Sequence, residues 1–319
     1  MVRYCKYYFY TLICILLLQI LPNNQIVIYL KLLRPKDWAK NLFLYIPLFF
    51  AGEIFNWIKV FQVFEGFVAF CCIASSIYII NDYADKEDDR KHPEKRNRPI
   101  ASGAVSPGTA LAIFGILVVV GFIIAYFINT RFLLLLAFYF FLNIGYSFGL
   151  KNIPILDIFI VAIGFALRVR SGGSIAKVDV TIWLNIMIFL LALFMAAGKR
   201  RDDVLLKISS GNDMRKAVKG YTLDFLNALL ALISSVMIVS YFMYTVSSSM
   251  VEKHNTNRLY LTSLFVMAGI MRYLQIIYVN IDSGSPTKIL YKDRFIQIAL
   301  LLWMISFYLI IYSKNIPFF

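Results

Sequence analysis

Charged residues are scarce in this chain, since Asp, Glu, Lys and Arg together make up only 16% of its 319 residues. Hydrophobic residues reach 60%, against roughly 45–50% in a soluble domain. A soluble fold of this length could not bury so much apolar surface. The composition therefore excludes a soluble protein and indicates an integral membrane protein whose spans are helices.

Cysteine is also rare. The chain has four cysteines, all inside apolar runs and without CxxC or CxxH spacing: Cys5, Cys14, Cys71 and Cys72. This pattern argues against a disulfide framework and against a cysteine metal site. The two histidines are isolated in loops, so the sequence assigns them no role. No tandem repeat of solenoid length is present either.

Acidic residues are outnumbered by basic ones, which gives a formal net charge of +14. Such an excess could indicate nucleic-acid binding. Lys and Arg clustered beside membrane spans more often set the topology and contact anionic lipid headgroups. We therefore expect a lipid bilayer and no nucleic acid among the partners.

Apolar runs long enough to cross a bilayer core of about 30 Å recur along the chain. We predict nine transmembrane helices, at residues 38–52, 60–82, 108–128, 131–149, 153–173, 179–198, 220–247, 258–280 and 294–313. A shorter apolar run at 7–21 precedes them and keeps no assigned role. The expected organisation is an N-terminal apolar segment (1–30) followed by a single transmembrane domain (31–319).

The loops between these helices differ sharply in charge. Twenty-one of the 32 Lys and Arg residues fall on one side of the predicted membrane and six on the other. Because basic loops stay cytoplasmic, we predict that loops 82–105 and 198–219 share the cytoplasmic face of the cell membrane.

Three carboxylates stand out in the first of these loops. Asp82, Asp85 and Asp89 lie at i, i+3 and i+7, which is one face of a helix. Carboxylates this close raise one another's pKa unless a cation sits among them, and Mg²⁺ prefers such oxygens together with substrate phosphates. Asn81 adds an amide ligand, and the basic run HPEKRNRP follows. The alternative interpretation is a solvated charged cap.

Two ionisable residues are expected inside the fifth span. Asp157 lies near its start and Arg168 follows about three turns later. Burying such groups unpaired is costly, so both count as candidates for function.

The pattern NDxxDxxxD followed by KRxRPIASG resembles the first signature of the UbiA superfamily of intramembrane prenyltransferases. One branch, the decaprenyl-phosphate phosphoribosyltransferase group, is similar over residues 31 to about 300. The stretches that carry this resemblance are LRPKDWAKN, YIINDYADKEDDRKHPEKRNRPIASGAVS, YSFGLKNIPILDIFIVAIGFALRVRSGG, MAAGKRRDDVLL and SPTKILYKDR.

The resemblance implies an all-α bundle around a central cavity that opens to the cytoplasmic side. It also implies a Mg²⁺-dependent transfer of 5-phosphoribose from phosphoribosyl diphosphate to a polyprenyl phosphate, with release of diphosphate. The superfamily's usual second acidic motif, DxxxD, is replaced here by GKRRDDVL. One carboxylate fewer and two cations more suit a donor with an additional phosphate.

The resemblance also assigns roles by position. Asp82 and Asp85 would be catalytic, and the metal ligands would be Asn81, Asp82, Asp85 and Asp89. The substrate phosphates would be bound by Lys36, Lys40, Asn41, Lys95, Arg96, Arg98, Lys199 and Arg200, with the last two on the sugar donor.

Two other functions stay open. The chain could be an ordinary prenyltransferase that moves an isoprenoid to an aromatic or other small acceptor, although the GKRRDD stretch argues against it. It could also be a lipid or ion transporter, but a transporter should place carboxylates near the bilayer midplane. The sequence gives neither the prenyl chain length nor the oligomeric state.

Overall fold

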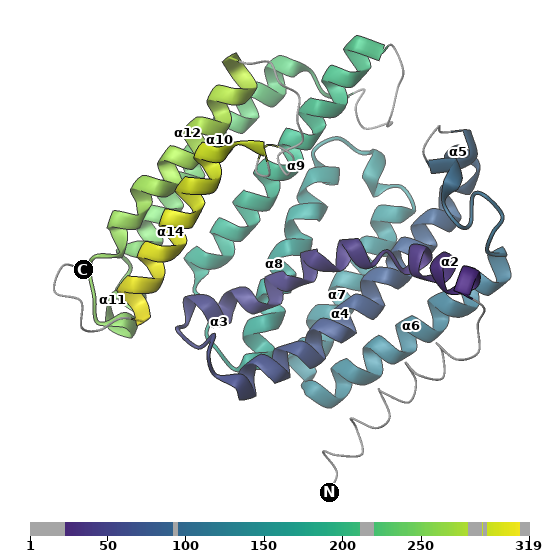
Figure 1. The fold of residues 1–319 in the computed structure, drawn as a ribbon, viewed down its shortest axis with the longest axis horizontal. Coiled ribbons are helices and arrows are strands. Elements are labelled where there is room, and N and C mark those ends of the chain that lie inside the picture. The colour runs from purple at the N-terminus through teal and green to yellow at the C-terminus, as the bar shows by residue number, and fades with distance from the viewer. Residues whose placement is uncertain (1–22, 92–94, 211–219, 280–288, 290–291, 313–319) are drawn as a thin grey trace, which may run out of the picture. The chain divides into compact units, whose positions relative to one another are not determined.

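A computed structural model describes residues 23–91, 95–210, 220–279, 289 and 292–312, and all regular structure within these ranges is helical (Figure 1). The N-terminal run at 7–21 lies outside the described residues. By their internal contacts the residues form two compact units. The first comprises Met1–Asn41 and Val68–Ile124, and the second Leu42–Phe67 and Ala125–Phe319.

Eight helices among the described residues are long and apolar enough to cross a membrane. They are α4 (Trp57–Ala84), α6 (Pro107–Ile128), α7 (Thr130–Ser147), α8 (Leu156–Ala176), α9 (Ile182–Ser210), α10 (Leu223–Thr245), α12 (Ser263–Val279) with the preceding 3₁₀ turn η5 (Leu259–Thr262), and α14 (Arg294–Tyr312). They correspond to eight of the nine predicted spans. Local signals start several of them: the Asn129 side chain caps α7, and Pro107 begins α6.

The predicted span 38–52 has a different form. It consists of a 3₁₀ helix, η1 (Pro35–Tyr45), followed by the short helix α3 (Ile46–Phe50). A 3₁₀ helix rises about 2.0 Å per residue and an α-helix about 1.5 Å, so together they extend roughly 30 Å. That length matches the hydrocarbon core of a bilayer. Nine crossings remain a prediction.

The first unit packs α2 (Asn23–Leu33), the C-terminal part of α4 and most of α6 around a small apolar core. Leu32, Ile79 and Ile100 are almost completely buried in it. The chain leaves α4 through a short turn into α5 (Lys86–Lys91) and then through η2 (Lys95–Asn97). This packing fixes the end of α4, where the acidic motif lies.

The second unit is larger, and α9 is its central helix, with extensive contacts to α8 and α10. η3 (Leu150–Asn152) leads into α8, and α11 (Ser248–His254) follows α10. The backbone of η1 comes so close to α8 that a Cβ atom built on Gly172 would lie 1.9 Å from the Leu44 carbonyl oxygen. Only glycine permits this approach.

Candidate active site

The acidic motif forms an ion-pair cluster with two arginines in the first unit. Arg34 Nη2 donates to both oxygens of Asp82, at 2.6 and 2.8 Å. Arg98 Nη1 donates to Asp82 at 2.9 Å and to Asp89 at 2.7 Å. Asp82 and Asp89 are buried while the two arginine side chains are about one quarter exposed. We call Arg34, Asp82, Asp89 and Arg98 the acidic-motif cluster.

Helical spacing brings two of these carboxylates, Asp82 and Asp89, to the same arginine. Asp82 lies in the last turn of α4, and Asp89 lies in α5. The amide of Asp85 donates to the Asn81 carbonyl at 2.9 Å, and the amide of Asp89 donates to Asp85 at 2.8 Å. Helical hydrogen bonding therefore continues through the turn, and the one-face prediction holds for Asp82 and Asp89.

Arg34 has an unusual backbone. It follows α2 and adopts φ = 52°, a left-handed conformation that costs a non-glycine residue roughly 1–2 kcal/mol. Its two bonds to Asp82 help to offset that cost. Strained backbone conformations concentrate at functional sites, and here the strained residue binds the first aspartate of the motif.

Tyr78 connects this cluster to a further cation. The Arg34 guanidinium lies 5.1 Å from the centre of the Tyr78 ring, and Lys40 Nζ lies 3.3 Å from the Tyr78 hydroxyl. Lys40 also pairs with Asp37 at 2.7 Å. Lys40 of η1 is thus linked through Tyr78 to Arg34 of the acidic-motif cluster, and its role in phosphate binding stays a prediction.

The other predicted residues of the first unit have varied surroundings. The Asn41 side chain is fully buried and donates to Cys71 Sγ at 3.3 Å, so it packs inside this unit. Asn81 and Asp85 are half-buried. Lys36 and Arg96 are exposed, and Lys95 is half-buried at the start of η2.

The contacts of Asp82 and Asp89 show whether these carboxylates suit Mg²⁺. Two separate carboxylates converge on one cationic atom, Arg98 Nη1, and carboxylate oxygens are the ligands that Mg²⁺ prefers. Among the described residues, however, no three or more His, Cys, Asp or Glu side chains are grouped to hold a metal. The chemistry of Asp82 and Asp89 fits a cation, and Arg98 supplies one in this arrangement.

A second ion-pair cluster lies within the second unit. Asp157, fully buried near the start of α8, accepts from Arg200 Nε of α9 and from the Tyr221 hydroxyl at 2.6 Å. Arg200 Nη1 also donates to Asp203 at 2.9 Å. Burial and the hydrogen bond to Asp157 raise the pKa of Tyr221 above its ordinary value, so its hydroxyl remains a donor at neutral pH. We call Asp157, Arg200, Asp203 and Tyr221 the buried cluster.

The three consecutive cations of GKRR therefore differ in their surroundings. Lys199 is exposed, whereas Arg200 and Arg201 are buried. Arg201 donates to Asn227 and to the Ile277 carbonyl, both at 2.8 Å. Two nitrogens of Arg200 are bound to carboxylates, so a phosphate contact through Arg200 would have to use its remaining nitrogen.

Arg168, the other ionisable residue predicted inside the fifth span, has neutral partners. It donates to the Gly164 carbonyl at 2.9 Å and to the Tyr139 hydroxyl at 2.8 Å. Its guanidinium lies 4.7 Å from the centre of the Tyr139 ring. Asp157 and Arg168 thus have separate roles in the packing of α8.

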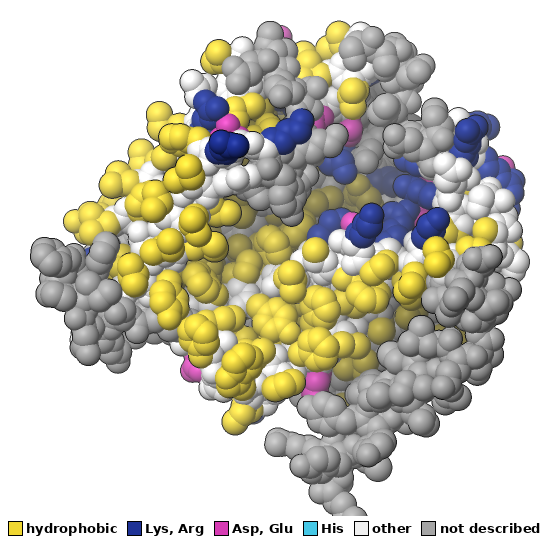
Figure 2. Space-filling model, viewed as in Figure 1, with side chains coloured by type: hydrophobic (Ala, Val, Ile, Leu, Met, Phe, Trp, Pro, Cys, Tyr) yellow, Lys and Arg dark blue, Asp and Glu magenta, His cyan; other side chains and the backbone are white. Residues whose placement is uncertain are grey.

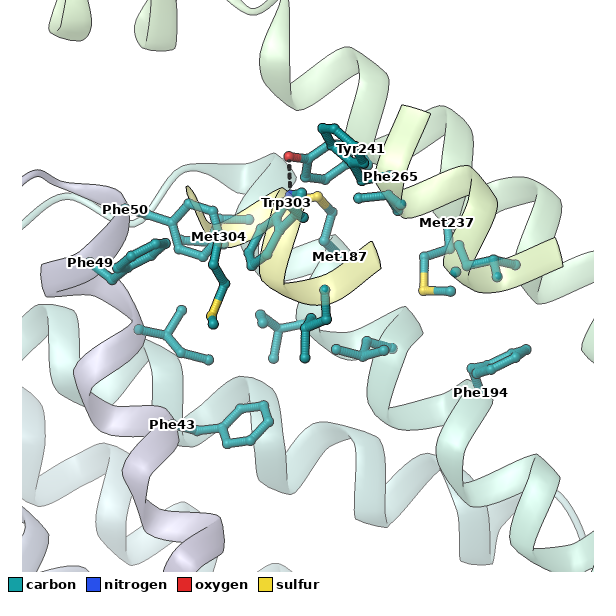
Figure 3. A pocket seen from close by; sticks show the side chains of 18 of the residues that line it. Phe43, Phe49, Phe50, Met187, Phe194, Met237, Tyr241, Phe265, Trp303 and Met304 are labelled. Carbon is teal, nitrogen blue, oxygen red and sulfur yellow. Dashed lines mark hydrogen bonds between the residues drawn. The ribbon is translucent and has the colours of Figure 1, made fainter. Parts of the chain in front are cut away.

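A large apolar cavity, about 530 Å³ in volume, lies within the second unit. Its walls come from η1, α3, α9, α10, α12 and α14, and Figure 3 shows aromatic and methionine side chains from several of these elements around it. Trp303 Nε1 donates to the Tyr241 hydroxyl at 2.6 Å, so these two polar groups satisfy each other. The lining suits a hydrocarbon ligand.

Charged and hydrophobic side chains gather on different parts of the molecular surface (Figure 2). Lys and Arg side chains gather over the region of α2 and α5 with acidic side chains among them, and hydrophobic side chains cover α3, α12 and α14 (Figure 2). Exposed apolar residues on α14, such as Ile298 and Leu301, are what a lipid-facing helix requires.

Sequence reasoning missed Arg34 and Tyr221. Arg34 stands in the stretch LRPKDWAKN, but its position before Pro35 gave no hint that it pairs with a residue 48 positions away. Tyr221 follows a polar loop and carried no motif. A buried aspartate that needs partners, Asp157, was the available signal for both Tyr221 and Arg200.

Comparisons with known proteins agree with the motifs. The model of the UbiA prenyltransferase family matches residues 42–203. The chain is 34% identical over 296 residues to a decaprenyl-phosphate phosphoribosyltransferase of Mycolicibacterium smegmatis, covering 89% of this chain and 92% of the relative. It is 32% identical over 299 residues to the protein of the same name from Corynebacterium glutamicum, covering 91% and 89%.

The fold also resembles solved structures. A UbiA homolog from Archaeoglobus fulgidus bound to GPP and Mg²⁺ superposes with a TM-score of 0.67 at 21% identity, covering 89% of this chain and 99% of the homolog. The all-α membrane architecture implied by the sequence is thereby confirmed.

Proposed function

Because the chain belongs to the UbiA prenyltransferase family, and is a multi-pass membrane protein, we propose that it transfers 5-phosphoribose from phosphoribosyl diphosphate to a polyprenyl phosphate. The observation that carries this proposal is the similarity to two relatives named for that transfer, which extends over about nine tenths of both chains.

The reaction requires one displacement. An oxygen of the acceptor phosphate forms a bond to the anomeric carbon of the ribose, and the bond from that carbon to diphosphate breaks. The acceptor oxygen is already an anion near neutral pH, so no strong base is needed. Catalysis then depends on positioning the two substrates and on balancing the charge of the leaving diphosphate.

The acidic motif would hold a divalent cation. Asn81, Asp82, Asp85 and Asp89 are the residues that would bind Mg²⁺, which supplies positive charge to the leaving diphosphate when bound. Arg34 and Arg98 already surround Asp82 within 3 Å. Their forked guanidinium groups also suit phosphate oxygens.

The remaining predicted contacts are proposed as phosphate ligands. Lys36, Lys40, Lys95, Arg96 and Arg98 would bind the donor together with Arg34. Asn41, which is buried against Cys71, would act by fixing η1. Lys199 and Arg200 remain proposed phosphate ligands, and the buried contacts of Arg200 give it a structural role as well.

The test uses membranes that contain the protein, radiolabelled phosphoribosyl diphosphate, Mg²⁺ and decaprenyl phosphate. We expect label in the lipid extract, none when Mg²⁺ is chelated, and about 10²- to 10³-fold less when Asp82→Asn replaces the wild type. A parallel reaction offers a prenyl diphosphate and 4-hydroxybenzoate. Prenylated product there, with no labelled lipid in the first reaction, would establish the ordinary prenyltransferase instead.

We also propose that the acidic motif faces the cytoplasm, which rests on the charge difference between the loops. A cysteine introduced at Ser102 in a variant without native cysteines should react with an impermeant reagent only from the cytoplasmic side of sealed vesicles. Labelling from the opposite side would contradict this orientation.

A further inference from the structure

The two arginines of the acidic-motif cluster bind the carboxylate oxygens that are also candidate metal ligands. Each carboxylate oxygen offers about two lone pairs. Asp82 Oδ1 accepts from Arg34 at 2.6 Å and from Arg98 at 2.9 Å, so both of its acceptor positions are taken. Asp89 Oδ2 accepts from Arg98 as well, at 2.7 Å. A metal ion that binds Asp82 and Asp89 through these oxygens must therefore displace an arginine.

Arg34 is the harder of the two arginines to displace. It donates to both oxygens of Asp82, and its guanidinium lies 5.1 Å from the centre of the Tyr78 ring, within the range of a cation–π contact. Its backbone is held on both sides, since its amide donates to the Leu30 carbonyl and its own carbonyl accepts from the Asp37 amide. Arg34 thus keeps other partners when one bond to Asp82 is lost.

Arg98 can leave the carboxylates by moving its side chain alone. Its backbone lies in a turn, where its amide donates to the Lys95 carbonyl and its carbonyl accepts from the Ser102 amide, both at 2.9 Å. Its side chain is 24% exposed and reaches both carboxylates through one nitrogen, Nη1. Rotation of the side chain therefore breaks both bonds at once and leaves the turn in place.

The charges of the cluster show what such a rotation requires. Moving Arg98 away leaves the buried carboxylates of Asp82 and Asp89 with one arginine between them, which is costly unless another cation takes its place. The released guanidinium equally requires an anion, and phosphate oxygens accept its forked donors as a carboxylate does. The exchange is therefore favoured when a divalent cation and a phosphate-bearing ligand are present together.

We propose that Arg98 and Mg²⁺ compete for Asp82 and Asp89, and that Arg98, once released, binds the diphosphate of the donor. Metal and donor then bind cooperatively, because each favours the arrangement that the other requires. In the absence of donor, Arg98 keeps the two carboxylates neutralised and holds metal binding weak. The identity of the donor rests on the proposed function, whereas the competition between Arg98 and the metal does not.

The first experiment measures metal binding to the full-length protein in lipid nanodiscs without donor. Mn²⁺ serves as the probe, because the free ion is quantified by electron paramagnetic resonance, and Mg²⁺ should compete with it. Arg98→Gln should tighten Mn²⁺ binding by at least about tenfold, since charge-assisted hydrogen bonds from Arg98 no longer compete for the carboxylates. A residue that only supports the fold would leave metal affinity unchanged or weaken it.

Lys91→Gln is the matched control for the loss of a positive charge. Lys91 lies on α5 two residues after Asp89 and is exposed. Because exposed charges are screened by salt, its removal should change the Mn²⁺ dissociation constant by less than about threefold. Equal tightening in Lys91→Gln and Arg98→Gln would show a general effect of charge and overturn the competition. Unchanged or weaker Mn²⁺ binding in Arg98→Gln would overturn it as well.

The second experiment follows Arg98 in the wild type and needs no variant. Phenylglyoxal modifies guanidinium groups that solvent can reach, and mass spectrometry locates the product. Saturating Mg²⁺ should make modification of Arg98 faster, and phosphoribosyl diphosphate added with Mg²⁺ should make it slower again. Arg90, which pairs with Glu87 at 3.1 Å outside the cluster, is the internal reference and should keep its rate.

Two results of this second experiment would contradict the proposal. An unchanged rate at Arg98 under saturating Mg²⁺ would show that the metal does not release it. Faster modification that phosphoribosyl diphosphate fails to slow would show that the released Arg98 does not bind the donor.

Failure of the exchange and failure of the proposed function give different results. If Arg98→Gln does not tighten Mn²⁺ binding while the wild type moves label from phosphoribosyl diphosphate to lipid, the function stands and the exchange is wrong. If Arg98→Gln tightens Mn²⁺ binding and Mg²⁺ speeds modification of Arg98, but no label reaches lipid, the competition holds and the proposed function fails.

Discussion

The two ion-pair clusters use the same chemistry in different surroundings. The acidic-motif cluster has arginines that are about one quarter exposed, at 23% and 24%. In the buried cluster, Arg200 is 5% exposed and Asp157 is fully buried. Partly exposed arginines can exchange a carboxylate for a phosphate because water and ligand can reach them. A guanidinium sealed between carboxylates cannot do so without leaving a buried charge unpaired.

This difference in exposure predicts that the acidic-motif cluster serves function and that the buried cluster serves stability. Changes in the acidic-motif cluster should affect turnover and substrate binding while folding is retained. Changes in the buried cluster should affect folding first. The following predictions test this contrast, from the largest expected effect to the smallest.

Asp157→Ala should cause the largest effect. It leaves Arg200 without its main buried partner and removes the acceptor of the Tyr221 hydroxyl. Removing one member of a buried pair typically costs about 3–5 kcal/mol. Unfolding of the purified protein in mixed micelles would measure this loss. Asp293→Asn, which breaks the partly exposed pair with Arg272, is the control and should change stability far less. Equal losses in the two variants would contradict the contrast.

Asp82→Asn should lower turnover by about 10²- to 10³-fold, or roughly 2.7–4 kcal/mol of transition-state stabilisation. Its unfolding midpoint should not fall comparably, because Arg34 and Arg98 are partly exposed and can be solvated. Turnover is measured as lipid-extractable label. Glu87→Gln makes the same charge change at an exposed site on α5 and should keep normal turnover. Near-normal turnover in Asp82→Asn would show that the motif is only a solvated charged cap and does not take part in the reaction.

Arg98→Ala should mainly weaken donor binding. One charge-assisted hydrogen bond is worth roughly 1.5–3 kcal/mol, so the donor KM should rise by about 10- to 150-fold. Arg200→Ala is the comparison variant, because we expect it to lower the free energy of unfolding more than it weakens donor binding. A rise in donor KM in Arg200→Ala, with unchanged unfolding, would instead show that Arg200 acts mainly as a phosphate ligand and not in stability.

Tyr221→Phe should have the smallest effect. It keeps the ring and removes only the hydroxyl, which donates to Asp157 and accepts from the Ile155 amide at 2.6 Å. The loss should be about 1–3 kcal/mol in unfolding free energy, with unchanged KM for both substrates. A raised donor KM without loss of stability would place Tyr221 in substrate binding.

Much of the fold could be predicted because membrane helices carry strong local signals. Eight of the nine predicted spans correspond to helices long and apolar enough to cross a bilayer, since about 20 apolar residues have few other stable states in lipid. The stretch 38–52 was harder. Its short length gave no sign that a 3₁₀ helix would replace an α-helix, because that choice depends on what η1 packs against.

The candidate site, like the fold, could be predicted in part from the sequence. The sequence by itself determined the membrane class, the helices and the face shared by Asp82 and Asp89, because helical periodicity and hydropathy act between near neighbours. Only the tertiary structure decided that Arg34 and Arg98 meet Asp82 and that Arg200 pairs with Asp157. These pairings join residues from separate helices. Their free energies depend on burial and mutual approach, which no local pattern records.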